Sequence, residues 1–386
     1  MNVTCVGGGP AGLMFAILAR RAGHDVTVLE QRTPAESFGW GVVFWEGLLE
    51  ALDRHDPQTA AAVRDEAYRW NDQVVTMPGV EDVRLPSYGY SMGRRRLLEL
   101  LGTLAEQSGV CVVRESFSGD PGRLAADLVV AGDGVNSALR GRGDFGTRLV
   151  RRRNMFLWLG TDREFTSFTF PFVSTPAGWV WGHAYGYADG ASTFVVETTP
   201  ETWSALGFAA LGPDATVRRL EELFADSLQG HRLQLRASAY EGHPWTEFVE
   251  VHNERWIGGN VALIGDAAHT THFTIGSGTR LAMEDAMALA DAIADQPDLD
   301  SALRVYDRTR REHLEGVQRV ARRSARWFER VPRYIGRPAP EFATLMENRR
   351  SPVMAHLPVG AYLRLTGTAA SLPMIEAPLR RLLARL

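Results

Sequence analysis

Lysine is absent from this sequence, because all 42 side chains counted as Lys or Arg are arginines. A chain without lysine cannot form a lysine Schiff base and cannot carry the lysine of a phosphate-binding P-loop. Cysteine is nearly as scarce, with Cys5 and Cys111 alone among 386 residues. Both lie in apolar, strand-like runs, so we expect two buried thiols in a reducing cytoplasm and no metal site.

Long hydrophobic runs and a strong net charge are missing as well. No apolar stretch reaches the length needed to span a bilayer, and we expect no signal peptide because the first residues are strand-like. The formal net charge of -4 gives no reason to expect nucleic acid or an anionic membrane as a partner. We therefore expect a cytoplasmic monomer or homodimer that acts on a small molecule.

The sequence does contain a glycine turn of the GxGxxG type, formed by Gly7, Gly9 and Gly12. Residues 2–6 are typical of the strand that enters such a turn, and residues 13–21 of the helix that leaves it. The three glycines permit the tight turn, the close approach of backbone to a pyrophosphate and the packing of helix on strand. The free N–H groups at the helix start also favour phosphate. This predicts an α/β, Rossmann-like domain that binds a dinucleotide.

Three later positions fit the same kind of cofactor. Residues 25–29 form a second strand-like run that ends at Glu30, where an acidic side chain binds ribose hydroxyls. Residues 132–134 read Gly-Asp-Gly and residues 265–269 read Gly-Asp-Ala-Ala-His, each after an apolar run. The combination is more specific than a glycine turn alone.

The middle of the chain has a different character. Residues 155–199 alternate aromatic and β-branched runs, with the hairpin signal Asp189-Gly190 between two of them. This predicts an antiparallel sheet inserted into a discontinuous nucleotide-binding domain. We assign residues 1–73, 94–150 and 252–330 to the nucleotide-binding domain, 74–93 and 151–251 to a substrate domain, and 331–386 to a C-terminal helical segment.

With these motifs placed, the chain resembles the single-component FAD-dependent aromatic hydroxylases, the p-hydroxybenzoate hydroxylase class. The resemblance rests on the glycine turn with Glu30, on residues 132–137 and 265–269, and on the pattern Arg94-x-x-Leu97. One departure is the loop 269–274, which lacks the proline that this class usually has there.

A narrower resemblance points to one branch of the class. It contains salicylyl-CoA 5-hydroxylase, anthraniloyl-CoA monooxygenase and the violacein-pathway hydroxylase. The matching segments are residues 38–44, which we expect to form a glycine-rich loop, and residues 158–161, 183–185, 192–197 and 272–278.

The resemblance implies a reaction in which NAD(P)H reduces FAD, O2 adds to give a flavin hydroperoxide, and an electron-rich ring is hydroxylated. It implies cofactor contacts at Gly7, Gly9, Pro10, Ala11, Gly12, Glu30, Gln31, Arg32, Gly41, Val42, Arg94, Asp133, Gly134, Gly265, Asp266, Gly276 and Gly278. We expect an apolar, water-excluding substrate pocket at Trp40, Phe170, Trp181, Tyr185 and Phe273.

Two histidines are candidates for a base that activates the ring. His272 lies in the loop expected to approach the flavin, and His183 lies in the aromatic sheet. The alternative for each is a histidine that is satisfied in the core without any part in catalysis.

The substrate stays open between an aryl thioester and a free indole or other polycyclic aromatic of secondary metabolism. A CoA or carrier-protein thioester would need cations for its phosphates, and residues 151–153 and 349–350 are arginine runs that are otherwise typical of a solvated surface. A flavin-dependent halogenase would need a lysine that this chain lacks. A non-catalytic FAD-binding protein is the alternative of a different class.

Overall fold

The computed structural model describes residues 1–36, 39–236 and 244–350, which form a mixed α/β fold around two sheets. The smaller sheet has the strand order β14-β15-β7-β1-β2-β6. Its strands are parallel except for β14, and the apolar runs predicted as strands, apart from the edge strand β6, are largely buried in it, as parallel sheets require. The strands are β1 (Asn2–Val6), β2 (Asp25–Leu29), β6 (Cys111–Val113), β7 (Leu128–Ala131), β14 (Ile257–Gly258) and β15 (Val261–Leu263).

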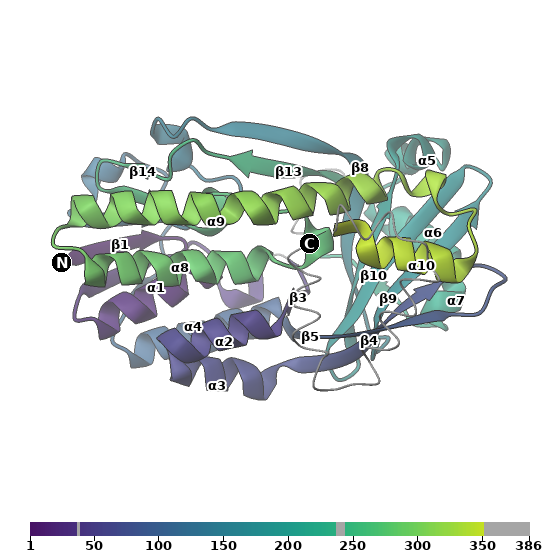
Figure 1. Cartoon of the computed structure of the whole chain (residues 1–386), viewed down its shortest axis with the longest axis horizontal. Coiled ribbons are helices and arrows are strands. Elements are labelled where there is room, and N and C mark those ends of the chain that lie inside the picture. Colours follow the sequence, from purple (N-terminus) through teal and green to yellow (C-terminus); the bar gives the residue numbers. More distant parts are fainter. Residues whose placement is uncertain (37–38, 237–243, 351–386) are drawn as a thin grey trace.

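Helices pack around the smaller sheet, and one of them reaches beyond it. Helix α1 packs against α4 and α8, and α8 packs against α9. Figure 1 shows α9 running along most of the molecule beside α8 and on toward the second sheet. These helices are α1 (Pro10–Arg21), α2 (Glu46–His55), α3 (Pro57–Glu66), α4 (Arg94–Gln107), α8 (Gly278–Asp295) and α9 (Leu299–Phe328).

The larger sheet has the order β12-β8-β11-β10-β9-β4-β5-β3, with β13 paired to β8. It is antiparallel apart from the parallel pair β4 and β9, and the predicted hairpin at Asp189-Gly190 joins β10 to β11. The strands are β3 (Gly41–Phe44), β4 (Tyr68–Thr76), β5 (Val83–Gly93), β8 (Arg148–Thr161), β9 (Phe168–Thr175), β10 (Gly178–Ala188), β11 (Ala191–Thr198), β12 (Leu233–Gln234) and β13 (Thr246–His252).

The two faces of the larger sheet are covered by different helices. Side chains alternate along its strands, so Phe194 packs into a core with α6 while Trp181 packs with Phe328 at the end of α9. The remaining α-helices are α5 (Pro200–Ala205), α6 (Pro213–Leu223), α7 (Ala225–Leu228) and α10 (Ala339–Glu347). The short 3-10 turns are η1 (Pro34–Glu36), η2 (Pro121–Arg123), η3 (Arg140–Arg142), η4 (Phe208–Ala210), η6 (Gly265–Ala267), η7 (Phe273–Ile275), η8 (Val331–Arg333) and η9 (Asn348–Arg350).

Two local expectations were wrong. The glycine-rich loop expected at residues 38–44 includes the strand β3, because Val42, Val43 and Phe44 are buried and pair with β5. Cys111 is exposed, since β6 is an edge strand, whereas Cys5 is buried in a central one. No helix in the described ranges is both long and apolar enough to cross a bilayer.

The division into domains stays a prediction. Strand β3 and the start of β4 fall in the segment 1–73 that we assigned to nucleotide binding, and both pair within the larger sheet. Of the predicted helical segment 331–386, residues 331–350 form η8, α10 and η9, and residues 351–386 lie outside the described residues.

Candidate functional site

The glycine turn is built so tightly that two of its glycines cannot be replaced. Gly7 has φ +103°, and a Cβ there would lie 2.3 Å from the carbonyl oxygen of Gly132. A Cβ on Gly12 would lie 2.0 Å from the carbonyl oxygen of Gly7. By contrast, a Cβ on Gly9 would meet no atom within 4 Å. The space in front of Gly9, at the N-terminus of α1, is therefore open to a ligand.

A cavity of ≈ 560 Å³ opens at this turn. It collects residues that lie far apart in the sequence, as the motifs predicted. The predicted cofactor residues on its wall are Gly7, Gly9, Glu30, Gln31, Arg32, Arg94, Asp133 and Gly134. Pro10, Ala11 and Gly12 are buried in the first turn of α1 behind it.

Two acidic side chains of the cavity wall hold the loops on which they lie. Glu30 accepts hydrogen bonds from the backbone N–H of Gly8 at 2.6 Å and of Arg32 at 2.7 Å. Asp133 accepts from the hydroxyl of Ser137 and from the backbone N–H of Leu139. Glu30 and Asp133 thus shape the cavity by fixing backbone, whether or not they also touch a ligand.

Arg94 carries the clearest sign of a missing anionic or oxygen-rich partner. Its backbone N–H donates to the carbonyl of Trp40, but its side-chain Nε is buried and has no hydrogen-bond partner in the described part of the chain. Burial lowers the pKa of Arg94, and the carboxylate of Asp266 opposes that shift. A buried donor without an acceptor is costly, so this side chain fits a bound group that carries oxygen atoms.

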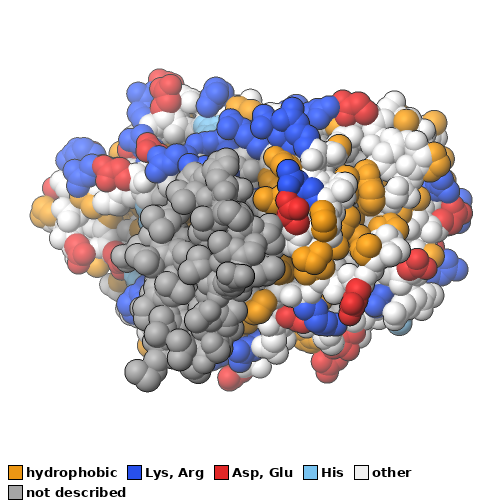
Figure 2. Space-filling model, turned by 45° about the vertical axis from the view of Figure 1, so that its right-hand side comes forward, with side chains coloured by type: hydrophobic (Ala, Val, Ile, Leu, Met, Phe, Trp, Pro, Cys, Tyr) orange, Lys and Arg blue, Asp and Glu red, His pale blue; other side chains and the backbone are white. Residues whose placement is uncertain are grey.

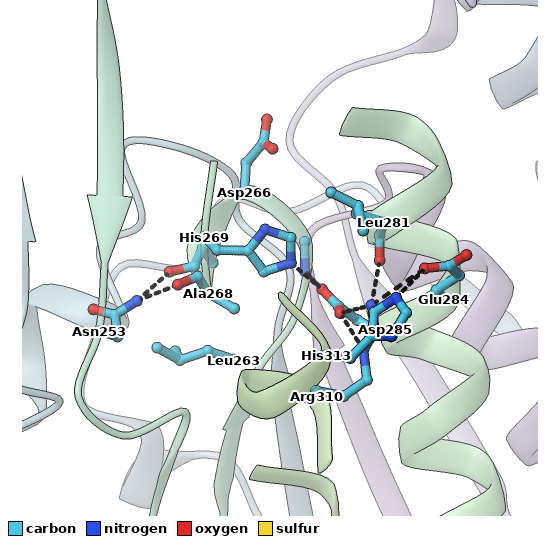
Figure 3. A network of polar contacts seen from close by, with 12 residues as sticks. Asn253, Leu263, Asp266, Ala268, His269, Leu281, Glu284, Asp285, Arg310 and His313 are labelled. Atoms are coloured by element: carbon cyan, nitrogen blue, oxygen red, sulfur yellow. Dashed lines mark hydrogen bonds and ion pairs between the residues drawn. The ribbon is translucent and has the colours of Figure 1, made fainter. Parts of the chain in front are cut away.

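The Gly265-Asp266 motif is held in place by a buried carboxylate on α8. Asp285 accepts from the backbone N–H of Gly265 at 2.9 Å and from Nε2 of His269 at 2.8 Å. Arg310 of α9 donates to its other oxygen at 2.8 Å. Figure 3 shows Asp285 between His269 and Arg310, with Asp266 directed away from them.

The charges in this network compensate one another. Burial would raise the pKa of Asp285, but its contact with His269, the positive charge of Arg310 and the hydrogen bond from Gly265 hold it below its usual value. We missed Asp285 and Arg310 in the sequence. The available signal was a charged residue on an apolar helix face, because Asp285 lies between Leu281 and Leu289 at four-residue spacing.

A second buried arginine, also missed, joins two of the motifs. Arg140 lies in η3 and donates to the carbonyl of Val135 at 2.6 Å and to that of Ala267 at 3.0 Å. The Gly132-Asp133-Gly134 turn is thereby fastened to the Gly265-Asp266 turn. Nothing in the spacing of the sequence indicated this contact.

The loop before α8 lies against β3. Gly276 has φ +61°, and a Cβ there would approach Val43 at 3.5 Å and Trp45 at 3.6 Å. Gly41 is also crowded, by Tyr187 and Thr193, and its backbone N–H donates to the Thr193 hydroxyl at 2.7 Å. Of the predicted residues, Gly276 thus lies against β3, the strand that contains Gly41 and Val42, and this strand also contacts α8.

The predicted pocket residues share one face of the larger sheet. Phe170, Trp181 and Tyr185 project from β9 and β10, and the Tyr185 hydroxyl donates to the carbonyl of Gly41. Phe273 of η7 packs over this face against Phe156, at a ring distance of 4.9 Å. The fifth predicted residue, Trp40, lies above Gly160 of β8.

His183 is paired with a fully buried carboxylate on the neighbouring strand. Its Nε2 lies 3.0 Å from Oε2 of Glu197, which also accepts from Trp181, while Asn154 donates to Oε1. Burial would raise the pKa of Glu197, but the hydrogen bonds from His183 and Asn154 lower it below its usual value. Burial lowers the pKa of His183, and Glu197 opposes this. The pair is therefore a carboxylate and a neutral imidazole.

His272 is also buried, and it is 3% exposed. Its Nδ1 lies 3.1 Å from the hydroxyl of Thr274, and its ring stacks on Phe273. Burial lowers the pKa of His272 to about 4. At neutral pH this imidazole carries no charge.

The expected cationic patches differ from one another. Arg151 and Arg153 are exposed, and each forms an ion pair with a glutamate, whereas Arg349 is buried rather than solvated. Figure 2 shows basic side chains along the edge where α9 and β8 lie in Figure 1. Exposed arginines of these two elements include Arg151, Arg153, Arg319, Arg323 and Arg326.

Two family models match the chain. The one described as FAD binding domain matches residues 90–321, and the one described as NAD(P)-binding Rossmann-like domain matches residues 5–35. Among solved structures, a mutant of 2-methyl-3-hydroxypyridine-5-carboxylic acid oxygenase has a TM-score of 0.67 at 20% identity, covering 90% of this chain and 97% of that one. At that identity the likeness establishes a shared fold.

Three curated relatives extend the match in sequence. Salicyloyl-CoA 5-hydroxylase of Streptomyces sp is 37% identical over 350 residues, which is 87% of this chain but 66% of that protein. A 3-hydroxy-4-methyl-anthranilyl-[aryl-carrier protein] 5-monooxygenase of Streptosporangium sibiricum is 39% identical over 86% of this chain and 90% of that protein. Protodeoxyviolaceinate monooxygenase of Chromobacterium violaceum is 28% identical over 91% of this chain and 95% of that protein.

The glycine turn gives a first test by a pair of matched alanine variants. Gly12→Ala forces a Cβ against the Gly7 carbonyl, so we expect a loss of about 3 kcal/mol in the free energy of unfolding. Gly9→Ala meets no protein atom and should unfold like the native apoprotein, while its affinity for FAD falls at least tenfold. Denaturant unfolding measures the stability of the two variants, and fluorescence titration measures their affinity for FAD. An unchanged FAD affinity of Gly9→Ala would contradict the binding of FAD in front of Gly9.

The Asp285 network predicts a large effect of an isosteric change. Asp285→Asn leaves the buried Arg310 with only the more distant carboxylate of Glu284, at 3.6 Å, so the free energy of unfolding should fall by about 3 kcal/mol. The matched control is Glu315→Gln on α9, which removes an exposed ion pair with Arg319 and should change stability by at most about 0.5 kcal/mol. If both variants lost the same free energy of unfolding in urea, the Asp285 network would contribute no more to stability than an exposed ion pair.

The low pKa of His272 predicts a pH dependence of stability. The pKa of His272 is about 4 in the folded protein and 6.5 in the unfolded chain. The neutral imidazole therefore contributes to the free energy of unfolding above pH 6.5, and this contribution is lost as the pH falls toward 4. In His272→Gln the decrease in unfolding free energy between pH 7 and 5 should be smaller by about 2 kcal/mol. Parallel stability curves of variant and native protein would exclude a depressed pKa.

Proposed function

The chain belongs to the FAD binding domain family of flavin-dependent aromatic monooxygenases, and from this premise we propose that it hydroxylates an electron-rich aromatic ring presented as an aryl thioester. It would use FAD, NAD(P)H and O2. The observation that carries the proposal is the arrangement of the cavity and the sheet. The glycine turn and its cavity lie on the smaller sheet. The loop 272–278 leads into α8, which packs against α1, and its Phe273 packs on a buried aromatic face of the larger sheet.

The residues of the cavity fit the proposed cofactor in type and position. The N-terminus of α1 with Gly7, Gly9 and Gly12 would receive the pyrophosphate, and Glu30 the adenosine ribose. Arg94, whose Nε lacks an acceptor, and Asp266 would flank the part of FAD between the phosphates and the ring. When bound, FAD supplies the reaction with an activated oxygen atom derived from O2.

The aromatic face of the sheet would hold the ring and exclude water. Phe170, Tyr185 and Phe273 supply apolar surface there. His183 would act as the proton acceptor, because its Nε2–H is donated to Glu197 and its Nδ1 has no partner among residues that the structure describes. A phenol or aniline proton transferred to Nδ1 would create an imidazolium that the adjacent Glu197 carboxylate stabilises.

The thioester form of the substrate is supported by the two relatives at 37% and 39% identity, whose names specify a CoA ester and an aryl-carrier protein. The exposed arginines along α9 and β8 offer charge partners for the phosphates of such a carrier. A free indole is the second candidate, favoured by the match to protodeoxyviolaceinate monooxygenase over nearly its whole length.

The proposal is tested by following NAD(P)H oxidation of the FAD-loaded protein together with product mass. Salicyloyl and anthraniloyl thioesters are compared with the free acids and with indoles. We expect stimulated NAD(P)H use and a mass gain of one oxygen with a thioester. Product from an indole alone would replace the first candidate with the second. Absence of stimulation by every compound would instead support the non-catalytic FAD-binding alternative.

A second measurement addresses His183. His183→Phe keeps an aromatic ring but removes the proton acceptor, so we expect product formation to fall by about 100-fold while FAD stays bound. Trp179→Phe on the same strand serves as the control because an indole carries no proton-accepting nitrogen. A His183→Phe protein with native turnover would eliminate this histidine as the base.

A further inference from the structure

Thr274 is the centre of a buried hydrogen-bond network behind the loop 272–278. Its hydroxyl lies 3.1 Å from Nδ1 of His272 and 2.8 Å from the hydroxyl of Ser324 on α9. Its carbonyl accepts from Arg349 of η9 at 2.8 Å. These four side chains are between 0% and 6% exposed. Three segments that are distant in the sequence therefore meet at one threonine.

The direction of the hydrogen bonds in this network is fixed at one end by arginine. A guanidinium can only donate, and Nε of Arg349 lies 2.9 Å from the hydroxyl of Ser324. Ser324 must therefore accept from Arg349, and its own proton is donated to Thr274. The Thr274 hydroxyl has one proton to place, and His272 Nδ1 is its one acceptor among the described residues.

The opposite arrangement would leave a buried group unsatisfied. If Nδ1 of His272 carried a proton, Thr274 would accept from both His272 and Ser324, and its own hydroxyl proton would have no acceptor in the described chain. Such a lost hydrogen bond disfavours an arrangement by about tenfold or more. The network thus selects the tautomer in which Nδ1 accepts.

Other charged groups around His272 leave this choice intact. The carboxylates of Glu197 and Glu250 favour a protonated ring, whereas His183 and Arg152 oppose it, and burial is the larger influence. No carboxylate among the described residues forms an ion pair with Arg349, whose guanidinium lies over Phe328 at 5.1 Å and near Phe170.

We propose that the Thr274 hydroxyl, which accepts from Ser324 and has its proton left for Nδ1, holds His272 as the neutral tautomer with its proton on Nε2. His272 then serves as a hydrogen-bond donor and not as the base. Nε2 of His272 has no hydrogen-bond partner in the described ranges. The His272 ring is stacked on Phe273, and the ring centroid of Phe273 lies 5.5 Å from that of His183. A substrate carbonyl or phenolate oxygen is the class of acceptor that this donor fits. Arg349 and Ser324 are positioning residues that act through Thr274.

The two histidines thereby acquire opposite roles. His183 donates Nε2–H to Glu197 and keeps an accepting Nδ1, whereas His272 accepts at Nδ1 and keeps a donating Nε2–H. A ring that carries a hydroxyl or amine next to a carbonyl offers one donor and one acceptor, which matches this pair. The use of the donor in hydroxylation rests on the proposed function, but the tautomer does not.

The tautomer is read directly by nitrogen NMR of the FAD-loaded protein labelled with ¹⁵N-histidine at pH 7. Two-bond proton–nitrogen correlations distinguish Nδ1–H from Nε2–H, and His272→Gln assigns the signal. We expect one neutral form with the proton on Nε2. In Thr274→Val the hydroxyl that donates to Nδ1 is lost, so the second tautomer should become detectable and the ratio should change about tenfold.

Matched variants separate the Thr274 hydrogen bond from a general disturbance of the loop. Thr274→Ser keeps the hydroxyl and should keep the native tautomer, and Ser324→Ala leaves His272 Nδ1 as the acceptor of the Thr274 proton and should keep the Nε2–H form dominant. Thr271→Val is the control in the same loop, because the Thr271 hydroxyl is buried and has no hydrogen-bond partner among the described residues. A native Nδ1–H tautomer or imidazolium, or a Thr274→Val protein with the native tautomer ratio, would overturn the proposal.

Activity provides an independent readout of the donor. His272→Gln retains an amide N–H near the position of Nε2, whereas His272→Phe retains the ring stack on Phe273 without a donor. We expect the fraction of NAD(P)H that ends in product to fall at least tenfold in His272→Phe and to stay within about threefold in His272→Gln. Equal losses in both variants would exclude the donor role, and an inactive native protein would instead count against the proposed function.

Discussion

The buried carboxylate of Asp285 is the contact on which the arrangement of the molecule depends. It joins α8 to the Gly265-Asp266 turn through a backbone N–H and to α9 through Arg310. Helix α9 packs into the core of the smaller sheet near its start and into the core beside the larger sheet at its end. The one network therefore sets the cofactor motif and the relative position of both sheets.

The cofactor side and the aromatic side meet at the short stretch from His269 to Gly278. Its first residue is held by Asp285, its middle by Thr274 and Arg349, and its end by the positive φ of Gly276 against β3. Each of these contacts comes from a different element. A loop held at three points is a suitable wall between a flavin and a substrate, because small displacements of a catalytic group reduce rate strongly.

The histidines illustrate how surroundings decide the role of a side chain. The sequence presents both His183 and His272 as candidates for a base. In the fold, His183 faces the Glu197 carboxylate, and His272 faces a hydroxyl whose proton is directed toward it. Their positions in the chain carry no trace of this difference, since the groups that create it lie up to 77 residues away, as Arg349 does from His272.

The sequence by itself determined the Rossmann-like turn, the strand and helix pattern around it, the inserted sheet, and the family to which these motifs belong. Those features are written in local apolar periodicity and in glycines whose neighbours leave no room for a Cβ. Only the tertiary structure decided that residues 41–44 form a strand, that Cys111 is exposed, and that Asp285, Arg310, Arg140 and Arg349 are buried. The reason is physical: burial and hydrogen-bond direction depend on which distant segments pack together, and no spacing within one segment records that.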